Sequence, residues 1–216
     1  MMARLNFRDA FTRTRICTRN CRVWNFTRAV WRLEISPSLW HLKDVTLAWI
    51  PLKLESIRTL LSTCEWMESL SLKNCWDIES FDIKKLELKK LVIDRCIIGT
   101  DYIGFEAPNL KVFKYCGSEP PGSEVKVVAG TIEEADLDLS PMDEFFACGN
   151  ELRKFIRDFF AVNVLTVCSV ILQGDEPVRL AEGLRVRHLK MKIQMHPQEF
   201  CGFFWFHNSC PRPKLQ

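Results

Sequence analysis

The sequence has no uninterrupted apolar stretch of about 18 residues, the length that a membrane-spanning helix needs, although 47% of its 216 residues are hydrophobic. Residues 1–32 also lack the continuous apolar core of a secretory signal peptide. These absences predict that the chain neither spans a membrane nor enters the secretory pathway, so we expect it in the cytoplasm or nucleus. The length suits one domain or at most two.

Acidic residues are scarce at the N-terminus. Residues 1–32 contain eight arginines and a single acid, Asp9, for a net charge of +7, whereas the rest of the chain holds 22 basic and 26 acidic side chains, a net −4. A mitochondrial presequence is Arg-rich and acid-poor, but it is also rich in serine, which this segment lacks. We expect a solvated, poorly ordered segment, and nucleic-acid binding is the alternative.

Recognisable catalytic motifs are missing as well. The sequence contains no G-x-S-x-G, P-loop or G-x-G-x-x-G pattern, and its four histidines lie beside no nucleophile motif. Ten cysteines are spread along the chain, and without an oxidising compartment we read them as free thiols. Neither Cys17 and Cys21 nor Cys201, His207 and Cys210 have a second ligand pair at zinc-site spacing. We therefore predict no enzymatic activity, no cofactor and no metal.

What the sequence does contain is a recurring apolar pattern: one apolar residue, two of any kind, a second apolar residue, one of any kind, and a third. The third positions are Leu47, Leu72, Ile93, Tyr115, Leu137, Val167 and Met191. The steps between them are 25, 21, 22, 22, 30 and 24 residues, and all but the step of 30 lie within the range of about 20–29 for leucine-rich repeats.

This spacing predicts an irregular α/β leucine-rich-repeat solenoid of about seven units. Each unit contributes a short strand whose alternate side chains point into the core, and stacked strands form a parallel sheet on the concave face. We expect helices and loops on the convex face. The domain would span residues 30–210, between a basic N-terminal segment (1–29) and a tail (211–216).

The segments that return from one strand to the next differ in character. Residues 54–64, 150–160 and 198–207 show helical apolar spacing, and the middle helix accounts for the step of 30. Gly99, Gly104 and Pro108 argue against a full helix in the units that end at residues 93 and 115. The segment 118–122 reads as a turn within the array.

Cysteines follow several of the predicted strands. Cys75 and Cys96 come three residues after the last strand position, where leucine-rich repeats place an inward Asn or Cys that bonds the adjacent unit's backbone. Cys116 and Cys168 directly follow their strand anchors and fit this role less well.

Outward strand positions and two tryptophans at the lip are the candidate partner-binding residues. Interfaces are rich in Trp and Arg, and side chains of mixed sign suit a protein better than nucleic acid, which favours a continuous basic face. The candidates are Thr46, Trp49, Ser71, Lys73, Trp76, Val92, Asp94, Lys114, Asp136 and Asp138, with Lys111 as a further outward position.

Several stretches resemble plant F-box/leucine-rich-repeat proteins of the FBD-like type. They are LLSTCEWMESLSLKNCW (60–76), LKKLVIDRC (88–96) and FEAPNLKVFKYCG (105–117), with weaker likeness in 165–173 and 207–216. The resemblance covers roughly residues 30–210. It implies a substrate-recognition module of an SCF-type ubiquitin ligase, which binds a protein target on its concave face.

One part of the family pattern is absent. Family members begin with an F-box that docks on a Skp-type adaptor, and residues 1–29 contain nothing like it. We therefore expect adaptor binding only if an F-box is supplied elsewhere. The alternatives are a truncated gene product without independent function and a nucleic-acid binder that acts through the basic N-terminus.

Overall fold

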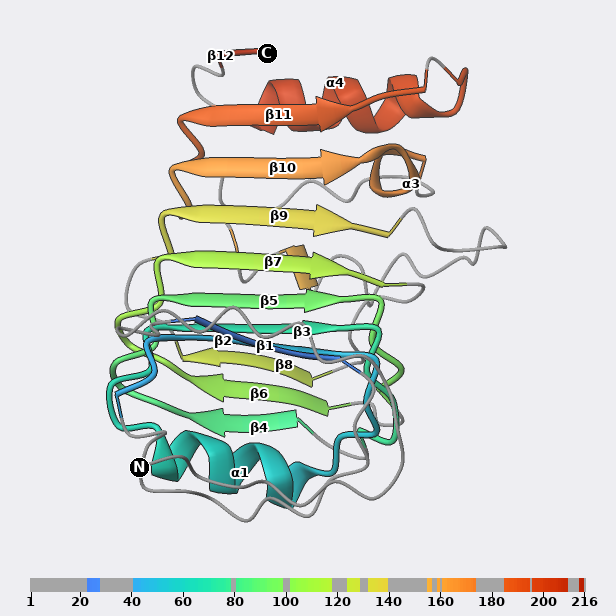
Figure 1. Cartoon of the computed structure of the whole chain (residues 1–216). Helices are drawn as coiled ribbons and strands as arrows, with labels where there is room; N and C mark the ends of the chain where they lie inside the picture. Colours follow the sequence, from blue (N-terminus) through green and yellow to red (C-terminus); the bar gives the residue numbers. More distant parts are fainter. Residues whose placement is uncertain are drawn as a thin grey trace.

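The structure is a computed structural model, and it describes residues 23–27, 41–78, 81–98, 102–117, 124–128, 132–139, 155–156, 159, 161–173, 185–194, 196–209 and 214–215. Within these residues, parallel strands stack one above another in a large sheet (Figure 1). In spatial order they are β1 (Val23–Thr27), β2 (Asp44–Ala48), β3 (Ser69–Lys73), β5 (Lys90–Asp94), β7 (Val112–Cys116), β9 (Glu134–Asp138), β10 (Val164–Cys168), β11 (His188–Lys192) and β12 (Lys214–Leu215).

The large sheet confirms the repeat pattern. Each of the seven predicted units supplies one strand, from β2 to β11, and all neighbours pair in parallel. The register is uniform, because Leu47 pairs with Leu72, and the same row continues through Ile93, Tyr115, Leu137, Val167 and Met191. The chain therefore has the predicted α/β leucine-rich-repeat fold.

A second layer covers one face of the large sheet and includes a feature that the repeat pattern does not predict. Three short parallel strands form a smaller sheet there: β4 (Phe81–Lys84), β6 (Tyr102–Glu106) and β8 (Glu124–Val128). They return the chain from the units with steps of only 21 and 22 residues. An extended segment can span the distance back to the next strand with few residues. Each such segment pairs with the corresponding segment of the next unit, and this pairing satisfies its backbone N–H and C=O groups.

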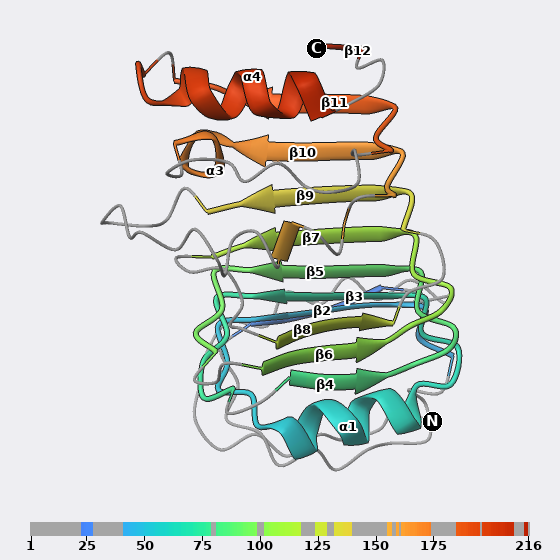
Figure 2. The same cartoon turned by 180° about the vertical axis from the view of Figure 1, so that it is seen from behind.

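Helices complete the second layer at the two ends of the array (Figure 2). The predicted helices at 54–64 and 198–207 are confirmed as α1 (Leu54–Thr63) and α4 (Glu199–Ser209), and a short helix α3 (Ser169–Leu172) follows β10. Most of the predicted helix 150–160 lies outside the described residues. Those described, Phe155, Ile156 and Phe159, are buried as its apolar face requires.

The hydrophobic core lies between the two layers. Along β3, β5, β7 and β9 the second and fourth residues are buried, while the others are partly or fully exposed. The core is therefore a continuous stack to which each unit adds two strand side chains. Near its middle, the rings of Phe113 and Phe159 are stacked with centroids 5.2 Å apart.

Cysteine side chains form hydrogen bonds with the backbone of adjacent units. The sequence predicted such a bond for Cys75, and Cys168, which was expected to fit the role less well, forms one too. The buried Cys75 thiol lies 3.6 Å from the Leu47 carbonyl of the preceding unit, and a hydrogen bond with Cys96 lowers its pKa. Cys96 contacts the Asp94 carbonyl of its own unit at 3.6 Å, and it also hydrogen-bonds the side chain and the backbone of Cys75 in the preceding unit, as predicted. The prediction for Cys168 was wrong, because its buried sulfur accepts the Leu139 N–H of the adjacent unit at 3.1 Å.

Strands β1 and β12 extend the sheet into the segments that the sequence assigns to the basic N-terminus and the tail. β1 pairs with all five residues of β2, and β12 pairs with His188 and Leu189 of β11. The loop predicted at 118–122 lies outside the described residues. Among the described helices, none is both long and apolar enough to cross a membrane.

Candidate interaction face

The large sheet presents one face to the core and the other away from it, and we call the latter the concave face. From β2 to β11 it is formed by the first, third and fifth residues of each strand, which the uniform register aligns in rows. Ala48, Thr166 and Cys168 occupy such positions but are buried. The middle row runs through Thr46, Ser71, Val92, Lys114, Asp136, Thr166 and Lys190. The structure thus brings five of the ten candidate residues into a single line.

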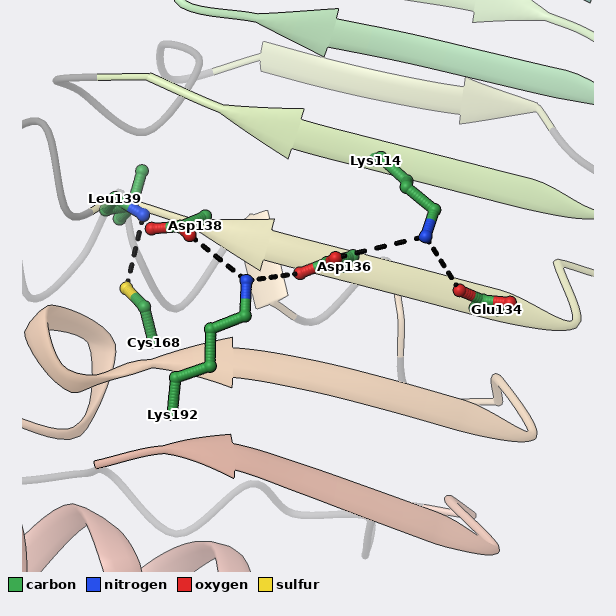
Figure 3. Close-up of polar contacts among 7 residues, drawn as sticks. All are labelled: Lys114, Glu134, Asp136, Asp138, Leu139, Cys168 and Lys192. Atoms are coloured by element: carbon green, nitrogen blue, oxygen red, sulfur yellow. Dashed lines mark hydrogen bonds and ion pairs between the residues drawn. The ribbon is translucent and has the colours of Figure 1, made fainter.

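An ion network occupies the concave face around β9 (Figure 3). Lys114 on β7 lies 3.0 Å from Glu134 and 4.0 Å from Asp136. Lys192 on β11 lies 3.2 Å from Asp136 and 3.1 Å from Asp138. Asp136 therefore joins two lysines from opposite sides, and three successive outward side chains of β9 are held by them.

Lys192 reaches β9 by crossing β10. Its backbone pairs with Cys168 of β10, yet its ammonium group contacts the two aspartates one strand further on. Burial lowers the pKa of Lys192, but hydrogen bonds to Asp138 and Asp136 outweigh that effect and raise it. The hydrogen bonds to the two aspartates therefore favour the charged form of this lysine.

We expect this network to order the face more than it stabilises the fold. The Lys192 side chain is 48% exposed, and ion pairs of that kind contribute at most about 1 kcal/mol. Lys192→Met should change the free energy of unfolding by less than about 1 kcal/mol, measured by urea denaturation. A loss of several kcal/mol would show that the network is a structural element and not a surface feature.

The other half of the concave face, over β2 and β3, has mostly small side chains, with Asp44 and Lys73 at its two edges. Thr46 and Ala48 lie on β2, and Ser69 and Ser71 lie on β3, with Val92 next to them on β5. Small side chains leave room for a partner's groups to approach the sheet. This half is therefore sterically open, while the half around β9 is charged and filled.

Residues with left-handed backbone form a lip where the first strands end. Trp49, Asn74 and Arg95 directly follow β2, β3 and β5, and their φ angles are 59°, 48° and 51°. Each N–H donates to the carbonyl of the next unit's last strand residue, as in Trp49 N–H to Lys73 O at 3.0 Å. Asn adopts this conformation readily, but a bulky Trp does so at a cost.

A second row of the lip is apolar. Trp76 forms a parallel bridge with Pro51, and the N–H of Ile97 donates to the Cys75 carbonyl at 2.8 Å, which places Ile97 in the next unit beside Trp76. Trp49, Trp76 and Ile97 are 51%, 37% and 70% exposed. The lip thus offers exposed apolar side chains beside the sterically open half of the sheet.

Lysine and glutamate side chains alternate at the opposite edge, where the strands begin. Glu68 accepts from Lys43 and Lys89, each at 2.8 Å, and Lys111 lies 2.9 Å from Glu133. Hydrogen bonds from Lys43 and Lys89 lower the pKa of Glu68 to about 2, despite an opposing effect of burial. This edge ties three consecutive units together through charged groups.

The depressed pKa of Glu68 has a consequence for acid stability. A carboxyl group whose folded pKa lies below its ordinary 4.5 stabilises the fold above pH 4.5, and that contribution is lost as the pH falls to about 2. Glu68→Gln should therefore flatten the dependence of the urea midpoint on pH between those values. Glu65→Gln, at an exposed site without an ion-pair partner among the described residues, should leave the dependence unchanged.

The candidate residues thus lie on one connected surface, which we call the interaction face: the concave face plus the lip. Lys73, Asp94 and Asp138 are the last residues of their strands and form the row of outward side chains next to the lip. Lys111 directly precedes β7 and lies at the opposite edge of the sheet. Sequence reasoning missed Glu134, Lys192, Arg95 and Ile97. Glu134 and Lys192 occupy the same outward strand positions as the candidates, so the pattern could have included them.

The fold and this face define a class of protein, the leucine-rich-repeat solenoid of the protein-interaction kind. A family model described as "At1g61320/AtMIF1, LRR domain" matches residues 22–213. The chain therefore belongs to that family of leucine-rich-repeat domains. No solved structure matches.

Curated relatives from Arabidopsis thaliana agree with this assignment. The chain is 30% identical over 181 residues to the putative F-box/LRR-repeat protein At5g54820, with 79% of this chain and 38% of that protein covered. It is 31% identical over 181 residues to the putative F-box protein At3g29830, with 79% and 39% covered. The chain spans about two-fifths of the length of these relatives, and the predicted resemblance to plant F-box/LRR proteins is confirmed.

Proposed function

We propose that the chain is a recognition module that binds a protein target on the interaction face and performs no chemistry of its own. The observation that carries this proposal is the aligned surface itself, in which ordered ion pairs, small side chains and exposed tryptophans adjoin. Tryptophan anchors beside preordered polar groups are typical of binding hot spots.

The charge of the concave face favours a protein over nucleic acid. Between β2 and β11 its described outward positions carry five lysines and five carboxylates: Lys73, Lys90, Lys114, Lys190, Lys192, Asp44, Asp94, Glu134, Asp136 and Asp138. A nucleic-acid site needs a predominantly basic surface to neutralise phosphates. A balanced face instead selects a partner with matching charges of both signs.

The likeness to F-box proteins supports a more specific role. Both relatives compared above are named as putative F-box proteins, and this chain spans about two-fifths of their length. We infer that the module presents a target to an SCF-type ubiquitin ligase whenever an F-box connects it to the Skp-type adaptor. Localisation in the cytoplasm or nucleus fits that role.

The test uses position-specific crosslinking in a plant cell extract. A photoreactive residue at Ser71 on the concave face should crosslink a partner, whereas the same group at Ser62, on the exposed side of α1, should not. Trp49→Gly should abolish the crosslink while keeping the fold, because glycine suits the left-handed backbone at that position. Equal crosslinking from Ser62, or no effect of Trp49→Gly, would contradict the proposal.

The ligase role has its own experiment. A pull-down of the chain with a purified Skp-type adaptor should show no binding, and fusion to an F-box should restore it. Binding by the chain alone would mean that a docking element has been overlooked. Failure of the F-box fusion to bring the crosslinked target to the adaptor would remove the ligase role and leave target binding intact.

A further inference from the structure

Two cysteines, Cys75 and Cys96, occupy matching positions in adjacent units. Each lies three residues after the last apolar residue of its unit's strand, and those apolar residues, Leu72 and Ile93, pair directly in the large sheet. The pairing continues beyond the strands, because the Ile97 N–H donates to the Cys75 carbonyl at 2.8 Å. Between parallel segments this bond sets Cys96 opposite Cys75. The two cysteines are therefore direct neighbours across two consecutive units.

The thiol groups of this pair meet on the core side of the sheet. Cys75 is fully buried, and the partly buried Cys96 packs against the core. The two side chains hydrogen-bond each other. Neighbouring segments of a sheet lie about 4.8 Å apart, and a disulfide joins residues whose Cα atoms are about 4.4–6.8 Å apart. A bond between the two sulfur atoms therefore needs no large movement of the backbone.

The unit before the pair shows that the fold does not require a thiol at this position. Ile50 lies three residues after Leu47, as each cysteine does after its own strand residue. The Ile50 carbonyl accepts from the Trp76 N–H at 3.2 Å, so Ile50 lies beside Cys75 in the same row. Ile50 is buried too, and an apolar side chain therefore fills this position in the core. Two adjacent thiols offer a reaction that the packing alone does not need.

Cys116, on the concave face at the end of β7, provides a contrast. It lies opposite Asp94 on one side and Asp138 on the other. Burial and these two carboxylates raise the pKa of the Cys116 thiol. In the pair, the hydrogen bond from Cys96 outweighs burial and lowers the pKa of the Cys75 thiol. The thiolate, which is the reactive form of cysteine, is therefore favoured in the pair and disfavoured at Cys116.

We propose that Cys75 and Cys96 form an oxidation site, which hydrogen peroxide converts reversibly into a disulfide. Once the pair has lost one proton, the two sulfurs share the other through their hydrogen bond, and the partly exposed Cys96 carries part of the negative charge. The Cys96 sulfur attacks one peroxide oxygen, the O–O bond breaks, and hydroxide leaves behind a sulfenic acid. The Cys75 sulfur then attacks the Cys96 sulfur, so that the S–S bond forms, the S–O bond breaks and water leaves with the Cys75 proton. The two thiols are oxidised, and the peroxide is reduced to water.

The disulfide acts on the lip. Trp76 and Ile97, two of its exposed apolar residues, directly follow the two cysteines in the sequence. A covalent link between the units restrains their separation at this point. The amide hydrogens of Trp76 and Ile97 should therefore exchange more slowly in the oxidised protein. The site is independent of the proposed function, since it needs only the two thiols.

Peptide mapping by mass spectrometry tests the site. The full chain is treated with excess hydrogen peroxide, its remaining thiols are blocked with N-ethylmaleimide, and it is digested without reductant. A linked pair of peptides that contain Cys75 and Cys96 should appear, and dithiothreitol should remove it. Cys96→Val should abolish the link while keeping the fold, because Ile50 shows that an apolar side chain fits this row.

Cys116→Ser is the matched control, because Cys116 is also partly buried at the end of its strand but faces aspartates. It should leave the link between Cys75 and Cys96 unchanged. The exposed Cys201 reports whether the oxidant acts, since its maleimide labelling should fall after treatment. The proposal is overturned if Cys201 is oxidised while Cys75 and Cys96 stay unlinked, or if Cys116→Ser removes the link as completely as Cys96→Val.

Discussion

Phe113→Ala lowers the free energy of unfolding by about 3–5 kcal/mol, the range for removing a buried aromatic ring from a core. Phe113 is fully buried in the middle of the array, and its ring stacks on Phe159 at 5.2 Å with an interplanar angle of 11°. Phe159 in turn packs edge-on against Phe155 at 5.4 Å. The substitution therefore removes one ring from an aromatic cluster in the core and leaves a cavity.

The loss should be seen as a lower urea midpoint with an unchanged slope, because the surface exposed on unfolding stays nearly the same. Phe113→Leu, which keeps most of the volume, should cost less than half as much. An effect of Phe113→Ala below about 1 kcal/mol would mean that neighbouring side chains close the cavity. It would contradict the assignment of this stack as the centre of the core.

The same stack explains why the repeat pattern weakens in the middle of the chain. Ala135 occupies a core position where the neighbouring units place Leu91, Phe113 and Leu165. Phe113 pairs directly with Ala135, so we infer that the rings of Phe113 and Phe159 take up the volume that a leucine supplies elsewhere. The sequence pattern therefore shows a degenerate repeat at Ala135, whereas Phe159, from the segment between β9 and β10, helps to fill the core at that position.

The large sheet could be predicted because apolar residues recur in the sequence at the spacing of its strands. Each strand buries two side chains at a fixed spacing, so Leu47 and its six counterparts reveal both the strands and their register. The smaller sheet could not be predicted in that way. Strands β4, β6 and β8 form because each pairs with the corresponding segment of the neighbouring unit, and no local sequence pattern indicates that pairing.

The outward placement of the candidate residues on one face of the sheet was predicted, but the contacts among them were not. Alternation along a strand shows which side chains point outward, and it identified Lys114, Asp136 and Asp138. It does not show that Lys192 crosses β10 to reach two of these residues, because that contact joins positions 56 and 54 residues apart. The lip residue Arg95 was missed because only the tryptophans were considered at the lip, although Arg95 follows β5 just as Trp49 follows β2.

Glu199 is the one described carboxylate that lies almost fully inside the protein, with 3% of its surface exposed. It accepts hydrogen bonds from the Ser169 hydroxyl, from the Gln194 N–H at 3.0 and 3.1 Å, and from the Gln173 amide at 3.3 Å. The amide of Gln173 also donates to Ser169 at 2.6 Å. One side chain at the start of α4 thus ties that helix to α3 and to the segment after β11.

Glu199→Ala should therefore destabilise the C-terminal end of the array by about 2–4 kcal/mol, because it leaves the buried Ser169 hydroxyl and the Gln194 N–H without their acceptor. Amide hydrogen exchange in α4 and the fluorescence of half-buried Trp205 report the release of the helix. Glu199→Gln, which keeps an acceptor oxygen, should cost less. Unchanged exchange in α4 for Glu199→Ala would show that apolar packing around Phe206 and Gly202 holds the helix by itself.

The pH dependence of this cluster gives an independent check on the charge of Glu199. Burial raises the pKa of its carboxyl group, but the hydrogen bonds from Ser169, Gln194 and Gln173 outweigh burial and hold it below 4.5. The stabilisation is therefore complete above the ordinary pKa and is lost as the pH falls through the folded pKa. The protection factors of the α4 amides, which correct for the slowing of intrinsic exchange in acid, should fall on acidification in the unsubstituted protein and stay nearly constant in Glu199→Gln, since the glutamine amide does not titrate. A parallel fall in both proteins would mean that a different group controls the attachment of α4.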